Sequence, residues 1–582
     1  MRINVAGDGF LLIDCPRRMR SATQSGELQS MRTARAKRRL PVARFLVFLL
    51  QIGTLVALLS VPATAGPLES AIAATLRSEA AERGSELETA FLVELDAFYA
   101  TRDYKPIWTG VDGVNDRGHE LLAVIGGAGT DGLDPQAYRH QELVALFNAD
   151  SPGDLARVEI LLSEALAWMT QHLAKGRVDP ALVERFNSLY PDGIDPQAVL
   201  LASVSATDLG RFVTSYAPDQ EEYRRLKQAL ADYRQFAADG TTWPVLPDGD
   251  ALKPDMRDAR VPLLRESLIG HGDLPADAPI AADPLLFDVT LQDAVKHFQI
   301  RHGLIDDGVV GKGTLEELNI QITDRIEQIV LNLERRRWMA DDRGSSYIFI
   351  NLSDFQLKVV RDGRTVFTSA IIVGTEYNQT PVFSDELEYL EFNPFWNVPP
   401  RIARNELLPK IKEDPGYLIA NNFELLSGWS GEASVVDPSA IDWAAMSAGD
   451  FTYKLRQRPG EGNALGRVKF MFPNQFDVYL HDTPARGLFA REVRAFSHGC
   501  MRVGDPLGLV EVVLAGEPGW DRARIDTIVA SGERTIVPLA QHLPVHIAYI
   551  TAFVNKDGSV HFRRDVYGRD LSLAQALFGP ET

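Results

Sequence analysis

Apolar residues recur at helical spacing in the first part of the chain. In residues 70–100 and 155–176 they return every three or four positions, which is the period of one face of an amphipathic helix. Gly176 stands at the end of the second stretch, where a glycine commonly ends a helix. His172 has no partner at metal-ligand spacing and is predicted to be a surface or capping residue. Residues 66–258 are therefore predicted to form a helical scaffold domain without chemistry of its own.

The apolar period changes further along the chain. Residues 259–322 alternate short helical stripes with glycine-rich turns, and residues 323–345 read as a helix that leads out of this region. From residue 346 to 570, runs of alternating apolar and polar residues rich in β-branched and aromatic types predict strands, with hairpin turns at Asp362-Gly363 and Asp557-Gly558. Residues 571–582 are predicted to be a tail. The predicted fold class is multidomain α+β.

The N-terminus departs from this globular pattern. Basic residues 32–40 precede an apolar run at 45–61 and small residues up to Ala65, which is typical of a cleaved secretory signal, residues 1–65. An uncleaved membrane anchor is the alternative, although the run is slightly short for a span. Met31 is a second possible start. The predicted localisation is the periplasm.

Charge and cysteine content narrow the function. The chain has 60 Lys and Arg against 79 Asp and Glu, a formal net charge of −19, and the basic N-terminus leaves the remainder more acidic still. This balance argues against nucleic acid as a partner, because such binding depends on clustered Lys and Arg. Cleavage after Ala65 would remove Cys15 and leave Cys500 alone. A single thiol kept in an oxidising compartment indicates catalysis.

The surroundings of Cys500 supply the other parts that thiol chemistry needs. His481 is the candidate base, and the backbone amides around Gly499 are the candidate oxyanion donors. Asp505 and Pro506 match a helix N-cap and first helical position, so a nearby helix start is expected to favour the thiolate modestly.

The sequence around Cys500, Ser-His-Gly-Cys-Met-Arg-Val at 497–503 with His-Asp-Thr-Pro at 481–484, closely resembles the signature of L,D-transpeptidases with a YkuD-type catalytic domain. Residues 373–374, 380–381 and 393–399 extend the resemblance over 325–570. The resemblance implies that Cys500 is the nucleophile and His481 the general base, oriented by the carbonyl of Asp482. Ser497, His498 and Gly499 are candidates for supporting the loop that carries Cys500, and His498 is also the alternative candidate for the base. Arg502, Tyr479 and Trp396 are candidates for binding the substrate. Arg502 stands where the minimal family pattern often has Asn.

Residues 259–322 resemble a small three-helix peptidoglycan-binding domain. The matching positions are Val295, Phe298, Gln299, 302–304, 307–308, Gly311 and 314–315. A folded spacer that binds nothing is the alternative. Residues 103–108 and 176–180 resemble turns in the scaffold domain of long YkuD-type enzymes.

A segment of about sixty residues, 404–462, interrupts the predicted strands and joins elements that flank Cys500. Insertions of this kind often act as lids, so we predict that it covers a substrate cleft. Tyr417, Trp429 and Tyr453 could line that cleft, but we predict that they form the core of the insertion.

Together these features predict a peptidoglycan L,D-transpeptidase that links third residues of peptide stems through a thioester on Cys500. An L,D-carboxypeptidase using the same acyl-enzyme, or an inactive wall-binding scaffold, are the alternatives. The expected partners are peptide stems and the sacculus, carbapenem-type inhibitors, and other cell-wall synthesis proteins. No cofactor or metal is expected, because the sequence has neither a dense His/Cys cluster nor a phosphate-binding loop.

Overall fold

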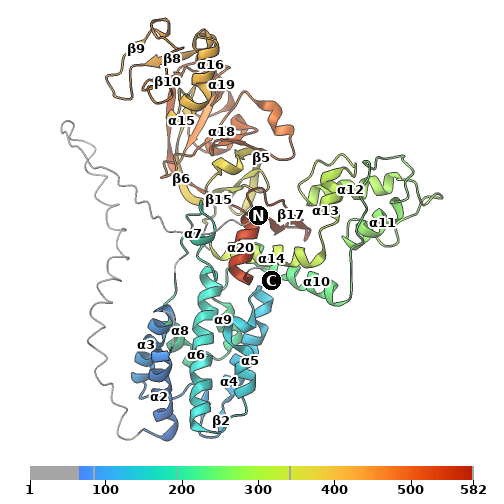
Figure 1. Cartoon of the computed structure of the whole chain (residues 1–582), viewed down its shortest axis with the longest axis vertical. Helices are drawn as coiled ribbons and strands as arrows, with labels where there is room; N and C mark the ends of the chain where they lie inside the picture. The colour runs from blue at the N-terminus through green and yellow to red at the C-terminus, as the bar shows by residue number, and fades with distance from the viewer. Residues whose placement is uncertain (1–64, 83–85, 192, 340–342, 580–582) are drawn as a thin grey trace, which may run out of the picture. The chain divides into compact units, whose positions relative to one another are not determined.

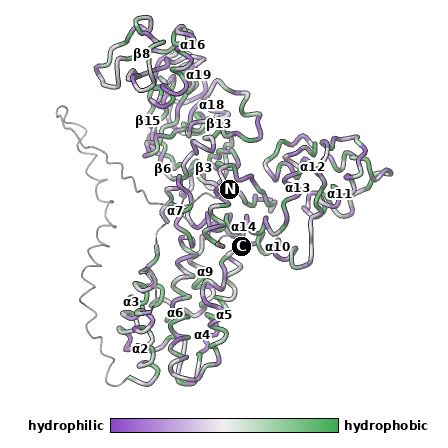
Figure 2. Tube along the Cα trace, in the orientation of Figure 1, coloured by the Kyte–Doolittle hydropathy of each residue, from purple (hydrophilic) through white to green (hydrophobic). Residues whose placement is uncertain are grey.

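The structure is a computed structural model that describes residues 65–82, 86–191, 193–339 and 343–579 (Figure 1). Residues 1–64 of the predicted signal (1–65), with the apolar run 45–61, lie outside the described residues. Hydrophobic and hydrophilic positions are interspersed along the described helices (Figure 2), and none of those helices is both long and apolar enough to cross a membrane.

The N-terminal domain is helical, as predicted, and is organised around α6 (Pro152–Lys175). The helix begins with Ser151 as its N-cap, and it ends at Gly176, whose φ of 85° suits glycine. His172 in its last turn is half-buried and lies 3.0 Å from the Tyr138 hydroxyl, so the prediction of a surface position is wrong. The other elements are α2 (Pro67–Glu82), α3 (Glu86–Ala100), β1 (Thr109–Gly110), β2 (Gly113–Val114), α4 (Asp116–Gly126), α5 (His140–Leu146), α7 (Pro180–Val183), α8 (Pro196–Ser205), α9 (Leu209–Thr214) and α10 (Glu221–Ala238).

A three-helix module follows, built from α11 (Val261–Gly270), α12 (Val289–Arg301) and α13 (Lys312–Leu318). Its core contains Phe287, Val295 and Phe298, all buried. Leu246 and Leu252 also belong to this core, and Leu252 forms a β-bridge with Val310. The core of the module therefore also includes residues that precede the predicted start at 259.

Helix α14 (Ile322–Arg337) connects the module to the C-terminal domain, and its second half, residues 329–337, is buried. Near its end, Arg335 forms ion pairs with Glu184 of the scaffold and with Asp570. Asp570 lies in α20 (Arg569–Phe578), whose Leu573 and Leu577 are buried in a cluster with residues of α14. The predicted tail is thus wrong for 571–578, since these residues form a helix that packs on α14.

The C-terminal domain is mainly β, as predicted. Its largest sheet has the strand order β13-β5-β14-β12-β11-β6-β15-β3-β4, and a further pairing of β4 with β5 closes it on itself. Asp362 and Gly363, with φ of 49° and 71°, make the tight β4–β5 turn that the sequence predicts. The strands are β3 (Tyr347–Asn351), β4 (Gln356–Arg361), β5 (Arg364–Gly374), β6 (Phe383–Phe392), β11 (Val468–Met471), β12 (Leu480–His481), β13 (Ala495–Ser497), β14 (Met501–Val503) and β15 (Thr535–Ala548).

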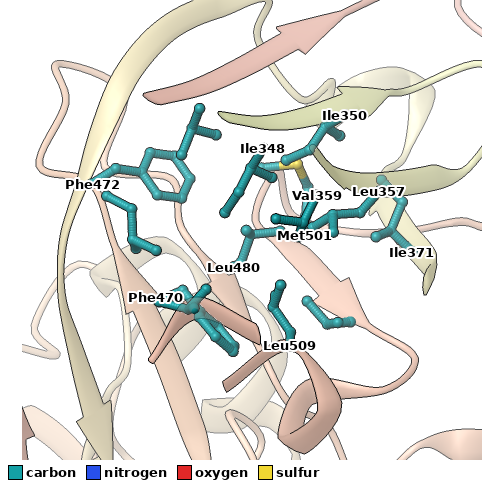
Figure 3. Packing of buried hydrophobic residues seen from close by; sticks show 14 of the residues in the cluster. Ile348, Ile350, Leu357, Val359, Ile371, Phe470, Phe472, Leu480, Met501 and Leu509 are labelled. Atoms are coloured by element: carbon teal, nitrogen blue, oxygen red, sulfur yellow. The ribbon is translucent and has the colours of Figure 1, made fainter. Parts of the chain in front are cut away.

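The interior of this sheet holds the main apolar core (Figure 3). Leu480 and Met501 are both fully buried in it, and they lie next to His481 and Cys500 in the sequence. The core therefore anchors the two strands that carry the candidate catalytic residues. Outside the sheet lie α18 (Pro506–Val513), which has Asp505 as its N-cap as predicted, α19 (Arg522–Ser531), and the hairpin of β16 (Ala552–Val554) and β17 (Val560–Phe562).

The predicted insertion forms a subdomain with its own sheet and core. The sheet order is β7-β10-β8-β9, and the core contains Val398, Trp443, Phe451 and Leu455. The subdomain starts at Trp396 rather than at 404, because β7 pairs with β10. Its elements are β7 (Trp396–Asn397), α15 (Pro400–Ile402), a π-helical turn at Ala403–Leu407, α16 (Leu408–Glu413), α17 (Tyr417–Ala420), β8 (Phe423–Leu426), β9 (Val435–Val436) and β10 (Lys454–Gln457).

Candidate active site

Cys500 and His481 lie on, or directly beside, two neighbouring strands of the closed sheet. Strands β12 and β14 run parallel, with Leu480 opposite Met501 and His481 opposite Arg502. Cys500 directly precedes β14, and His481 ends β12. Backbone pairing thus fixes the separation of the two strands before any side-chain contact is made.

The His481 imidazole is held in one orientation by the backbone. Its Nδ1 lies 2.5 Å from the carbonyl oxygen of Asp482, the contact that the family resemblance implies. A carbonyl only accepts, so Nδ1 carries the proton and Nε2 keeps a free lone pair. The Asp482 carboxylate is itself fixed by the backbone N–H and Nε of Arg467, both at 2.9 Å, and by Arg486. Asp482 therefore supports the orientation of His481.

Burial keeps the His481 imidazole neutral. The side chain is 5% exposed, and desolvation lowers its pKa to about 3, with the nearby charges of Arg502 and Lys469 acting in the same direction. The hydrogen bond to Asp482 opposes this shift without reversing it. At neutral pH the ring is thus an unprotonated base.

The Cys500 thiol is half-buried, and desolvation raises its pKa above the ordinary value. Hydrogen bonds from the backbone and hydroxyl of Tyr479, and the charges of Lys469 and Arg502, partly offset this rise. Strand β14 lies between Cys500 and α18 in the sequence, and burial determines the direction of the pKa shift of Cys500. Burial thus favours a neutral thiol and a neutral imidazole in the resting protein, and both residues line the same cavity.

A ring of hydrogen bonds holds the loop before Cys500. Ser497 Oγ accepts the Gly499 N–H at 3.1 Å and donates to the Cys500 carbonyl at 2.5 Å. Thr380 Oγ1 donates to the Gly499 carbonyl at 2.8 Å and accepts the Gly374 N–H at 3.0 Å. Gly499 has a φ of 115°, which favours glycine. The predicted support role of Ser497 and Gly499 thus has a geometric basis.

These bonds change the expectation about the oxyanion donors. The Gly499 amide is occupied by Ser497 Oγ, so it is not available to a substrate oxygen. The Cys500 amide has no hydrogen-bond partner among the described residues. The His498 amide likewise has no partner there, so the His498 and Cys500 amides remain as candidate donors of this loop.

A cavity of about 1140 Å³ opens over the pair, and the closed sheet and the inserted subdomain both contribute to its lining. Such a volume is large enough for a peptide-sized ligand. Tyr453 packs in the subdomain core, whereas Trp429, 50% exposed, lies at the cavity, and Tyr417 takes part in both. The preferred reading of all three as core is thus wrong for Trp429. The cavity also brings together the predicted site residues Cys500, His481, His498, Ser497, Arg502, Tyr479 and Trp396.

His498 connects the Cys500 loop to the inserted subdomain. Its Nε2 lies 2.6 Å from Glu406 Oε1, and both side chains are about half-exposed. The rival base therefore has Nε2 engaged by a carboxylate, unlike His481.

Three residues contribute to the site although none of them was given a role there from the sequence. Lys469 lies opposite His481 across β11 and β12, and its Nζ is 4.2 Å from the centre of the Tyr479 ring. Glu406 also gave no signal, whereas Thr380 belongs to a dipeptide that resembles the family. No group of three His, Cys, Asp or Glu residues within the described part of the chain is placed to hold a metal ion.

Comparisons with known proteins identify the parts of the chain. Residues 345–525 match the family described as "L,D-transpeptidase catalytic domain" (YkuD), residues 257–318 match "Putative peptidoglycan binding domain", and residues 93–230 match "Scaffold domain". A "Putative L,D-transpeptidase" of Haemophilus influenzae is 38% identical over 251 residues, which cover 43% of this chain and 50% of that protein. The chain thus spans about half the length of this curated relative.

Solved structures with some likeness are L,D-transpeptidases. That from Stackebrandtia nassauensis is 16% identical, with 54% of this chain and 99% of that chain covered and a TM-score of 0.19. That from Xylanimonas cellulosilytica is 14% identical, with 52% and 98% covered and a TM-score of 0.16. The domain limits come from the family matches, and these structures carry no argument.

Proposed function

We propose that this chain, which carries a YkuD-type L,D-transpeptidase catalytic domain and a peptidoglycan-binding domain, is a peptidoglycan L,D-transpeptidase that works through a cysteine thioester. One observation carries the proposal. Cys500 and a neutral His481 with a free Nε2 face one cavity large enough for a peptide stem.

In the proposed reaction His481 Nε2 takes the thiol proton as Cys500 Sγ attacks the carbonyl of the third residue of a tetrapeptide stem. The amide bond to the terminal D-alanine breaks, and the imidazolium returns the proton to the leaving amine. The amine of a second stem then attacks the thioester, gives its proton to His481, and regenerates the thiol. The Cys500 amide would stabilise the oxyanion in both steps.

The charges around Cys500 support this sequence of steps. Lys469 and Arg502 favour the thiolate, so they would stabilise negative charge that develops on sulfur as the proton leaves. Tyr479 is placed to hydrogen-bond the same sulfur. Trp396, Tyr417 and Trp429 supply apolar surface for the stem.

We further infer that the three-helix module binds the sacculus and that the chain is exported to the periplasm by its N-terminal signal. The family match of residues 257–318 supports the first inference. The basic, apolar and small-residue pattern of residues 32–65 supports the second. N-terminal sequencing of periplasmic protein should give a chain that starts near Gly66, and a retained Met31 or Met1 would replace cleavage with anchoring.

Mass spectrometry of muropeptides tests the activity. Incubation of residues 66–582 with tetrapeptide muropeptides should give dimers joined through their third residues, and Cys500→Ala should give none. Trimmed monomers without dimers would make the chain an L,D-carboxypeptidase. If neither protein gave a product, the chain would instead be interpreted as a wall-binding scaffold.

Acylation by a carbapenem tests the base. We expect one adduct on wild-type protein that peptide mapping places on Cys500. His481→Ala should slow its formation by about 100-fold to 10,000-fold, the usual contribution of a positioned base. His498→Ala should keep the wild-type pH dependence, because that residue contacts Glu406. Normal acylation of His481→Ala together with loss in His498→Ala would exchange the two roles.

A further inference from the structure

Three consecutive arginines near the end of α14 are buried, and two of them have acidic partners. Arg335 pairs with Glu184 and Asp570. Arg337 pairs with Glu334 at 2.9 Å and also donates to the Tyr223 hydroxyl. Such pairing is what allows a guanidinium to be buried.

Arg336, between them, is different. It is 5% exposed, yet it forms no ion pair with any described residue, and its Nε has no hydrogen-bond partner there. Desolvation lowers its pKa to about 10, and the attraction of Glu222 is too weak to offset this, while the charges of Arg343 and Arg225 lower it further. The protein thus buries a cation without a direct counter-charge, which is energetically costly.

The Arg336 side chain lines a cavity of about 460 Å³ that is also lined by residues of α10, β3, β4, and β16 with the turn that follows it. Arg225, also lining it, has a buried Nε without a partner among the described residues. Arg343 completes the group, and its Nη2 is 3.3 Å from Glu222 Oε2. Three guanidinium groups therefore share one carboxylate.

The other charges of the cavity do not cancel this excess. Lys358 and Lys556 add two further cations without ion pairs among the described residues. Asp354 is paired with Arg563 at 2.5 Å, and Asp557 accepts hydrogen bonds within its own turn from Ser559. Tyr347, Phe349 and Phe553 provide aromatic walls. The cavity shares no lining residue with the one at Cys500.

We propose that this cavity is a binding site for an oxyanion carried on a small organic molecule, with the Arg336 guanidinium as the buried anchor. A carboxylate or phosphate group fits the planar donors of Arg336, Arg225 and Arg343, and the aromatic walls contact the rest of the ligand. The volume lies in the range of small-molecule sites. Two kinds of ligand carry such a group: a peptide stem, through its carboxylates, and a phosphate compound. A peptide stem as the ligand rests on the proposed function, whereas a phosphate compound does not.

Isothermal titration calorimetry on residues 66–582 tests the site, with Cys500→Ala in every protein so that no stem is consumed. The probes are inorganic phosphate and a peptidoglycan tetrapeptide, each against sodium chloride of equal ionic strength. We expect at least one probe to bind, and Arg336→Met to weaken that binding about tenfold or more, as loss of a charge-assisted hydrogen bond does. Arg225→Met should weaken the same binding.

Arg211→Met is the matched control, since Arg211 is exposed on α9 and does not line the cavity, and binding should be unchanged. Because Arg336→Met removes a buried unpaired charge, its unfolding temperature in sodium chloride should equal or exceed that of the parent, which excludes misfolding as the cause. Phosphate binding alone identifies a phosphate ligand, and tetrapeptide binding alone a stem carboxylate. No binding of either probe, or equal binding by both cavity variants, overturns the proposal.

Discussion

Replacing Ser497 by alanine should loosen the Cys500 loop by an amount that the hydrogen bonds of Ser497 allow to be estimated. The hydroxyl accepts the Gly499 N–H and donates to the Cys500 carbonyl, and Ser497 is buried. The Ser497→Ala substitution would leave the buried Gly499 N–H and the partly buried Cys500 carbonyl unpaired, at up to about 1–3 kcal/mol each. We therefore expect a local loss of about 2–4 kcal/mol after partial relaxation.

Hydrogen exchange followed by mass spectrometry measures this loss where it occurs. A change of about 2 kcal/mol corresponds to about 30-fold faster exchange, so peptides covering 495–503 should lose at least that much protection. Carbapenem acylation of Cys500 should slow in the same variant, because the Cys500 amide is no longer held in place. The intact fold of the rest of the chain is checked by unchanged exchange in α6.

Ser531→Ala is the matched control. Ser531 Oγ also accepts one backbone N–H, from Glu533, and donates to one carbonyl, that of Ile528, but it is exposed on α19. Water can satisfy the groups that it leaves, so the cost should be below about 1 kcal/mol. Protection of 495–503 within about threefold of wild type in Ser497→Ala, with normal acylation, would refute the role given to the hydroxyl.

Three other outcomes are expected. Burial lowers the pKa values of His271 and His481 to about 3, whereas a histidine in the unfolded chain titrates near 6.5. Between these pH values the unfolded chain binds more protons than the folded chain, so stability should fall as the pH drops from 6.5 to 3. The expected loss is up to about 1.4 kcal/mol per pH unit for each histidine. A flat melting profile between pH 4 and 7 contradicts this. Glu406→Ala should reduce muropeptide turnover by up to about fivefold without changing carbapenem acylation, since an exposed pair contributes at most about 1 kcal/mol; Glu413→Ala, exposed on α16, is the control, and equal effects on both reactions would reject a lid role. The module prepared alone as residues 244–320 should cosediment with sacculi, and a fragment that stays in solution would be a spacer.

The parts of the fold that were predictable depend on neighbouring residues. The Asp362-Gly363 turn needs only two residues that tolerate positive φ, and the start of α18 needs only Asp505 and Pro506. The tail was mispredicted because Leu573 and Leu577 become core positions only when α14 lies beside them. The pairings of β14 with β5 and of β15 with β3 and β6 likewise join residues far apart in the sequence, as do the contacts that set the limits of the inserted subdomain.

The candidate site divides in the same way. Cys500, His481 and the supporting Ser497 lie in motifs that the sequence displays, and the Asp482 contact is to the next residue. Lys469 comes near the thiol only through the pairing of β11 with β12, and Glu406 reaches His498 across 92 positions. The raised pKa of Cys500 could not be predicted, because it depends on burial by the folded chain.

The strands that hold Cys500 and His481 belong to a different sheet from the subdomain that lines the same cavity. The thiol and the imidazole are held by the backbone of the closed sheet, whereas residues 396–457 have a sheet and core of their own. Under the proposed function, sequence changes in that subdomain would therefore change the choice of wall fragment without altering the strands that carry the thiol and the imidazole. An inhibitor that reaches Cys500 without contacting residues 396–457 would then be insensitive to such changes.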